Sequence, residues 1–204
     1  MSAAAALGLV ACAVGVVVVR RRRVAVALVA LQSLILAGVA LADGIGHSVA
    51  LAVAGGALIV KGLALPALLG WVAARTPEPR AIVGERHALA RAGAAIALAL
   101  ALVLLLPSLG LTGEAQAAAA ALVAIGTATV LLRRAAIFHV LGFLVAENGV
   151  YAAALGSPDG LPALIEIGLM FDLVLVISVA SLFSDRIHAE LGTANTGLLE
   201  EIRD

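Results

Sequence analysis

Long apolar stretches alternate with short polar connections along almost the whole chain. A helix needs roughly 20 mostly apolar residues to cross a bilayer core of about 30 Å, and seven stretches meet that length within boundary error. We place them at residues 2–19, 24–42, 48–74, 92–111, 116–132, 137–155 and 161–183. The pattern predicts an all-α integral membrane protein built as a bundle of seven transmembrane helices.

The basic residues of the connections fall on one side of this predicted bundle. Four arginines lie between the first two stretches, four between the third and fourth, two between the fifth and sixth, and two in the tail. The other connections carry Asp43, Glu114 and Asp159 and no lysine or arginine. Because cytoplasmic loops accumulate basic residues, we expect an outside N-terminus and a cytoplasmic C-terminus.

The composition agrees with the membrane class. Hydrophobic residues occupy 63% of the 204 positions and charged residues 13%, a ratio typical of an integral membrane protein. A single cysteine, Cys12, excludes an intrachain disulfide and a cysteine-ligated zinc or iron–sulfur centre held by this chain alone. The sequence also has no phosphate-binding loop, metal-ligand cluster or nucleophile constellation, so we expect no catalytic centre on this chain.

Four ionisable residues remain well inside the predicted spans, namely Lys61, Glu147, Glu166 and Asp172. A charge at the bilayer centre costs about 3 kcal/mol, so such residues usually face other helices or water and often mark ion paths. Lys61, Glu147 and Asp172 fall near mid-depth of the third, sixth and seventh spans, whereas Glu166 lies about 9 Å nearer the outer surface. We take the four as candidates for a proton path.

A static role is the alternative for each of these residues. Lys61 would then pair with Glu147 or Asp172 as a buried ion pair that fixes helix register, and Glu166 would be partly hydrated near the interface. One lysine against three acids leaves at least two carboxyls without a basic partner in this chain. Those carboxyls are then protonated, hydrated or paired with another subunit.

Three further residues accompany the candidates. Asn148 is expected to make interhelical hydrogen bonds, and Tyr151 lies four residues after Glu147 on the same stripe of its helix. Pro66 lacks an N–H and clashes with the carbonyl four residues before it, so it predicts a kink beside Lys61. That kink is interpreted either as a hinge or as a static bend.

The chain from Arg133-Arg134 onward is similar to known membrane subunits. The segments IFHVLGFLVAENGVYAAAL, LPALIEIGLMFDLVLVISV and GLLEEIRD resemble component E of the hydrogenase-4 and formate hydrogenlyase family. This part also resembles the K-type subunit of respiratory complex I and the C-type subunit of multisubunit sodium/proton antiporters. We accordingly divide the chain into a four-helix part at 1–112, a three-helix part at 113–185 and a cytoplasmic tail at 186–204.

The resemblance implies a noncatalytic membrane subunit of a complex I-like machine in a bacterial or archaeal cytoplasmic membrane. Its partners would be antiporter-like membrane subunits, the lipid bilayer and a cytoplasmic redox arm, with no nucleic acid. Nickel–iron and iron–sulfur centres would lie in partner subunits and no cofactor on this chain. Glu166 matches the acid in the last helix of the K-type subunit, whereas the other K-type acid aligns with Leu144, about one turn before Glu147.

We therefore expect the chain to line part of a proton or sodium path. Glu147 and Glu166 would be the exchange sites, and Lys61 and Asp172 would tune them. Two alternatives stay open: a structural adaptor without ion conduction, and a subunit of a multisubunit cation/proton antiporter that has no redox partner.

Overall fold

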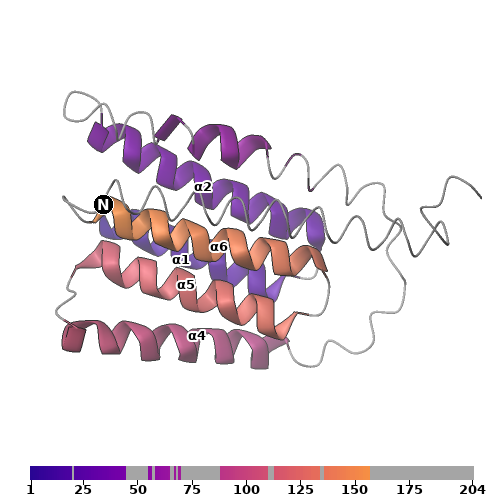
Figure 1. Ribbon diagram of the computed structural model, residues 1–204. Coiled ribbons are helices and arrows are strands. Elements are labelled where there is room, and N and C mark those ends of the chain that lie inside the picture. Colours follow the sequence, from indigo (N-terminus) through magenta and orange to yellow (C-terminus); the bar gives the residue numbers. More distant parts are fainter. Residues whose placement is uncertain are drawn as a thin grey trace, which may run out of the picture.

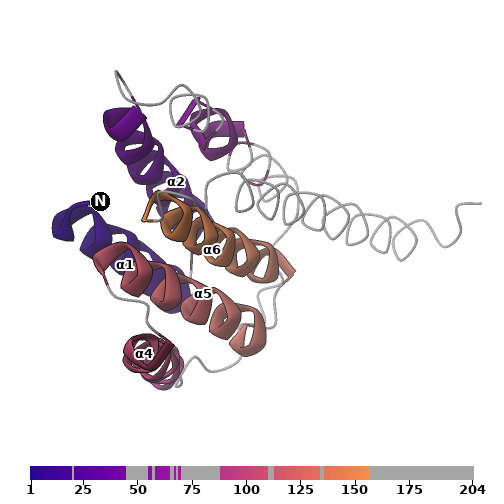
Figure 2. The same cartoon turned by 60° about the vertical axis from the view of Figure 1, so that its left-hand side comes forward.

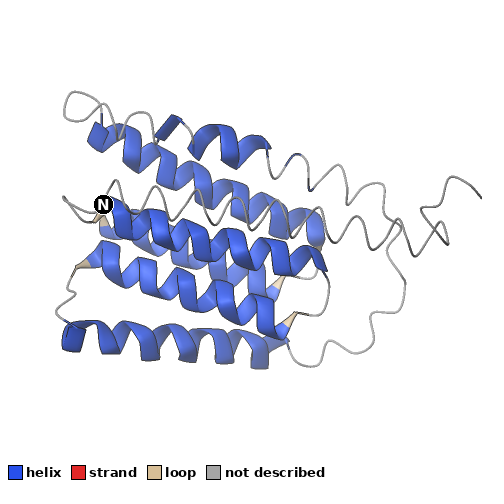
Figure 3. Ribbon diagram, viewed as in Figure 1, coloured by secondary structure: helices blue, strands red, loops and turns tan. Residues whose placement is uncertain are grey.

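Every regular element that the computed structural model describes is a helix (Figure 3). The described residues are 1–19, 21–44, 55–56, 58–64, 67, 69, 88–109, 113–133 and 136–156. The elements are α1 (Ala3–Val18), α2 (Arg22–Gly44), α4 (Ala88–Leu105), the short 3₁₀ helix η1 (Leu106–Leu109), α5 (Glu114–Leu132) and α6 (Ala136–Leu155). Residues 58–64 are helical as well.

Three of these helices are long and apolar enough to cross a membrane. They are Arg22–Asp43, Glu114–Leu132 and Ile137–Leu155, and they coincide closely with the second, fifth and sixth predicted spans. The first and fourth predicted spans form shorter apolar helices, Ala3–Val18 and Leu89–Leu105. The part of the chain that the structure describes is all-helical, and its apolar helices are those of a membrane protein. The third predicted span is described only in part and the seventh, at 161–183, lies outside the described residues, so the count of seven stays a prediction.

The helices lie side by side along a common direction (Figure 1). Helix α6 packs on α5 and on α2, while α1 packs on α2, α5 and α4 (Figure 2). Helix α4 covers the outer side of α5. The largest fully buried apolar side chains come from four helices, which shows that the core is shared across the bundle: Leu9, Val16 and Val17 of α1, Val29 and Leu36 of α2, Leu122 and Ile125 of α5, and Leu141 and Val145 of α6.

The backbones of helices α5 and α6 approach each other closely. A Cβ on Gly142 would lie 2.7 Å from the carbonyl oxygen of Gly126, and a Cβ on Gly149 would lie 2.8 Å from that of Ala119. These distances are too short for any side chain, so glycine is required where the two backbones meet. Gly142 and Gly149 are seven residues apart and share one face of α6. That face is turned toward α5, which leaves the other faces of α6 for other helices.

Helix α4 differs from its predicted span at both ends. It begins at Ala88 instead of residue 92, which places Arg91 in its first turn and not in the preceding connection. The guanidinium nitrogens Nε and Nη2 of Arg91 are buried in the bundle. The α-helix ends at Leu105, and the chain continues as η1 because Pro107 cannot donate a backbone hydrogen bond.

Candidate functional site

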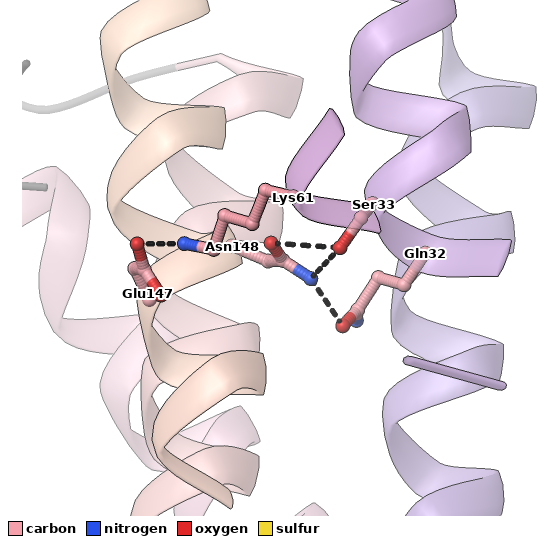
Figure 4. Close-up of polar contacts among 5 residues, drawn as sticks. All are labelled: Gln32, Ser33, Lys61, Glu147 and Asn148. Carbon is pink, nitrogen blue, oxygen red and sulfur yellow. Dashed lines mark hydrogen bonds and ion pairs between the residues drawn. The ribbon is translucent and has the colours of Figure 1, made fainter. Parts of the chain in front are cut away.

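Lys61 and Glu147 form an ion pair within the described bundle (Figure 4). Glu147 lies in the middle of α6 and is 1% exposed, and the Lys61 side chain, from helical residues 58–64, is 11% exposed. The Lys61 Nζ atom also lies 5.1 Å from the ring centroid of Tyr151, one turn further along α6, within the range of a cation–π contact. Of the two partners that the sequence suggested for Lys61, the structure shows Glu147.

The two charges neutralise each other where neither could be hydrated well. An isolated charge in a buried position loses its hydration, and the loss is regained only through a partner of opposite sign and additional polar contacts. Here the carboxylate of Glu147 is paired with the Lys61 ammonium, and the ammonium contacts both the carboxylate and the face of the Tyr151 ring. The buried pair therefore carries no net charge inside the bundle.

A second polar cluster, formed by Gln32, Ser33 and Asn148, lies beside the ion pair (Figure 4). The Asn148 amide donates to Gln32 Oε1 at 3.0 Å and to Ser33 Oγ at 3.2 Å. The Ser33 hydroxyl donates to Asn148 Oδ1 at 3.4 Å, and Gln32 Nε2 donates to the carbonyl oxygen of Leu9 at 2.9 Å. These bonds join α6, α2 and α1. The expectation that Asn148 bonds between helices is confirmed.

Helix geometry separates the two polar groups. Consecutive residues of an α-helix point about 100° apart, so Glu147 and Asn148 cannot face the same neighbour. Glu147 is directed to Lys61 and Asn148 to α2. The helical segment 58–64 lies directly against α2 at this level, because a Cβ on Gly62 would be 2.9 Å from the Cβ of Ser33. The close approach at Gly62 brings Lys61 next to the cluster.

Gln32 and Ser33 were not among the residues expected at the site. The sequence argument followed ionisable groups, and these two side chains are neutral. A signal was nevertheless present, since they stand together in the middle of an otherwise apolar span, and uncharged polar side chains inside a membrane helix usually bond to another helix. The partner of these two side chains could not be predicted, because Asn148 is more than a hundred residues away along the chain.

Three of the predicted site residues cannot be placed. Glu166, Asp172 and Pro66 lie outside the described residues. The site as described therefore consists of the ion pair Lys61–Glu147 with Tyr151, and of the neighbouring amide cluster. Within the described residues, no group of three or more His, Cys, Asp or Glu side chains is placed to hold a metal ion.

A second buried charge, Arg133, closes one end of the bundle. It is 7% exposed, lies directly after α5, and donates from Nη2 to the Val19 carbonyl at 3.1 Å and from Nη1 to the Val17 carbonyl at 3.5 Å. Its guanidinium carbon is 3.5 Å from the ring centroid of Phe138. Burial and the nearby charge of Arg91 lower the pKa of Arg133 to about 10, so it remains a cation at neutral pH. The sequence places Arg133 in the connection between the fifth and sixth predicted spans, and it lies there, directly after α5; the burial of its side chain was not predicted.

Comparison with known proteins gives one similar sequence and no named function. No family model matches the chain, and no solved structure matches it. The chain is 31% identical over 82 residues to a curated protein of Mycobacterium tuberculosis (strain ATCC 25618 / H37Rv), which is described as uncharacterized protein Rv0085. The match covers 40% of this chain and 37% of the relative's length, so the chain spans only about a third of that relative. The resemblance to component E subunits stays a prediction.

Proposed function

We infer that this chain is a noncatalytic subunit of a membrane complex, and that Lys61 and Glu147 form part of a proton or sodium path coupled to a redox arm. The observation that carries the proposal is the buried ion pair between helical residues 58–64 and α6. Ionisable side chains inside a membrane bundle are rare and usually functional. A lysine and a glutamate are both ionisable, so both can take part in a proton relay.

The pair suits a relay because a change in the charge of Glu147 has a large effect on its attraction to Lys61. Protonation of Glu147 would leave the Lys61 ammonium without its carboxylate, and loss of the proton would restore the pair. Two unit charges 4 Å apart interact by about 1 kcal/mol in water and about 4 kcal/mol at the effective dielectric constant of a protein. A single proton on Glu147 therefore changes the balance of forces between its helix and the Lys61 segment.

The neighbouring groups favour one direction for such a path. The side of Glu147 next to Asn148 is filled by amides and a serine hydroxyl that bond to one another, and side-chain amides do not titrate. Lys61 is the more exposed member of the ion pair. In the proposed path, a proton therefore reaches or leaves Glu147 on the Lys61 side.

The proposal includes a bundle of seven helices with an outside N-terminus, in a bacterial or archaeal cytoplasmic membrane. The charges of the described residues support this orientation. Five arginines lie at the end of the bundle where α1 and α5 end and where α2 and α4 begin, whereas Asp43 and Glu114 lie at the opposite end. The arginines are Arg21, Arg22, Arg23, Arg91 and Arg133. By the rule that basic ends are cytoplasmic, the arginine end faces the cytoplasm.

The partners follow from the sequence resemblance to component E subunits. In such an assembly the redox arm, with nickel–iron and iron–sulfur centres, belongs to other subunits, and antiporter-like subunits flank this chain in the membrane. The site fits that place, because a carboxylate and an ammonium can exchange a proton but supply no driving force. Energy then comes from the redox arm.

Glu147→Gln in the native complex tests the proposal. Inverted vesicles carrying the complex are given the electron donor, and proton movement is followed with a pH-sensitive dye while electron transfer is measured in parallel. We expect the variant to keep its subunits and its electron transfer but to lose most of its proton movement. Glu114→Gln is the matched control, since Glu114 is an exposed acid at the start of α5. Unchanged proton movement in Glu147→Gln would overturn the exchange role.

A structural adaptor is the second candidate, and the same contacts favour it. Both the ion pair and the amide cluster join helices that are distant in sequence, and buried charge pairs in some proteins act only to fix register. On this hypothesis Glu147→Gln weakens the fold, and the purified complex loses subunits. The subunit content of the variant complex, measured by mass spectrometry, separates the two functions.

A further inference from the structure

We propose that Gln32, Ser33 and Asn148 are positioning residues, which fix the rotation of α6 about its axis and thereby hold Glu147 against Lys61. The functional part of this inference rests on the proposed relay, whereas the structural part does not. The juxtaposition that carries it is the adjacency of Asn148 and Glu147 on α6, with one directed to α2 and the other to Lys61 (Figure 4).

The cluster is built to resist rotation of α6. Asn148 uses both its amide nitrogen and its oxygen, since it donates to Gln32 and Ser33 and accepts from Ser33. Gln32 in turn donates to the Leu9 carbonyl, so its side chain is anchored on α1. The three side chains are 3% exposed or less, and buried hydrogen bonds of this kind are expensive to leave unmade. A turn of α6 would break several of them at once.

A small rotation is sufficient to separate the ion pair. A side-chain atom near the outer radius of a helix lies about 6 Å from the axis. A rotation of about 30° moves such an atom by about 3 Å, which is comparable to the length of a hydrogen bond. The contact of α6 with α5 is made by glycine, alanine and aliphatic side chains. A hydrogen bond from Gln116 Nε2 of α5 to the Gly156 carbonyl, at 3.2 Å, lies just beyond the end of α6 and away from Glu147. At the level of Glu147 the hydrogen bonds that restrain rotation of α6 are those of Asn148.

The chemistry of the cluster assigns it to positioning and not to the path itself. Amides and an aliphatic hydroxyl carry no group that gains or loses a proton near neutral pH. The chain of bonds also ends on a backbone carbonyl, that of Leu9. Gln32 reaches no atom of the ion pair through these bonds, so an effect of Gln32 on Glu147 is transmitted through the helices, and its bond to Asn148 makes α6 the direct route.

A double-mutant cycle between Gln32 and Glu147 tests the inference. The full-length chain is placed in lipid nanodiscs, and thermal midpoints are measured for the wild type, Gln32→Met, Glu147→Gln and the double variant. If Gln32 holds the ion pair in place, replacing Gln32 should lower the thermal midpoint less in a chain that already lacks the pair. We expect the double variant to lose about 3 °C less than the sum of the two single losses. Ser33→Ala replaces Gln32→Met if the methionine variant does not fold.

Thr129→Val provides the matched control cycle. Thr129 is a fully buried hydroxyl that bonds only to the Ile125 carbonyl of its own helix among the hydrogen bonds described. Its loss should add to that of Glu147→Gln without coupling. Additive losses for Gln32 and Glu147 would overturn the positioning role.

Proton movement in the native complex separates this inference from the relay. Gln32→Met is expected to keep the subunits and to lower proton movement several-fold, while Thr129→Val leaves it unchanged. Coupled midpoints together with unchanged proton movement in both Gln32→Met and Glu147→Gln would retain the positioning role and refute the relay. Uncoupled midpoints with lost proton movement in Glu147→Gln alone would refute the positioning role and retain the relay.

Discussion

Removal of the Lys61 charge should destabilise the bundle far more than removal of the whole ion pair. In Lys61→Met the chain keeps a flexible side chain of similar length, but the Glu147 carboxylate is left 1% exposed without its ammonium. Breaking a buried pair in this way costs about 3–5 kcal/mol, whereas replacing both partners with apolar side chains is often close to neutral. The double variant Lys61→Met/Glu147→Met should therefore recover most of the loss.

The assay is thermal unfolding of the full-length chain in lipid nanodiscs. For a chain of this size, 1 kcal/mol corresponds to about 2–4 °C in the unfolding midpoint, so a 3 kcal/mol loss lowers the midpoint by about 6–12 °C. Val60→Met is the control for the substitution itself, because Val60 is the preceding residue and is 67% exposed. It should shift the midpoint by less than about 1 °C. Equal midpoints for the single Lys61 variant and the double variant would refute the reasoning, since no uncompensated carboxylate would then be detectable.

Three further predictions concern the α5–α6 contact, the arginine end and the orientation of the bundle. Gly142→Ala should lower the unfolding midpoint by several degrees, because its Cβ would lie 2.7 Å from the carbonyl oxygen of Gly126 and 2.7 Å from Val130 Cγ2, whereas Gly93→Ala, whose Cβ meets nothing within 4 Å, should not. Arg133→Lys should cost about 1–2 kcal/mol in chemical unfolding, because one ammonium cannot bond two carbonyls and stack on a ring as a guanidinium does; an unchanged unfolding midpoint would contradict this. Cysteines introduced at Asp43 and Arg21 should react with an impermeant maleimide from the outside and from the cytoplasm, respectively, and the reverse pattern would invert the orientation.

The sequence predicted the class of fold because its signal is local. Apolar length alone identified the helices α2, α5 and α6, which agree with the predicted spans within a few residues. The ionisable residues Lys61 and Glu147 could likewise be singled out from their place inside such spans. Their mutual contact was one of two possible pairings, because spacing along the chain does not determine which helices are neighbours in a bundle.

Contacts between helices that are distant in sequence determine the parts of the site that could not be predicted. Gln32 is a neutral residue next to Ser33 in an otherwise apolar span, and its importance appears only when α2 lies beside α6 and its side chain reaches Asn148. Arg133 was assigned to a loop because arginine pairs usually mark the aqueous side of a membrane. It is buried because two carbonyls at the end of α1 have no further helical partners, and the guanidinium supplies their hydrogen bonds.

The position of α6 between three neighbours explains how it holds a charge that few membrane helices could accept. Its glycine face contacts α5, Asn148 bonds to α2, and Glu147 is paired with Lys61 of the 58–64 segment. Because adjacent residues point about 100° apart, a helix with packing partners on several sides can direct Glu147 and Asn148 to different helices. The same arrangement makes the ion pair sensitive to the rotation of α6. A change in the charge of Glu147 would thus act on the whole helix, and a movement of the helix would act on Glu147.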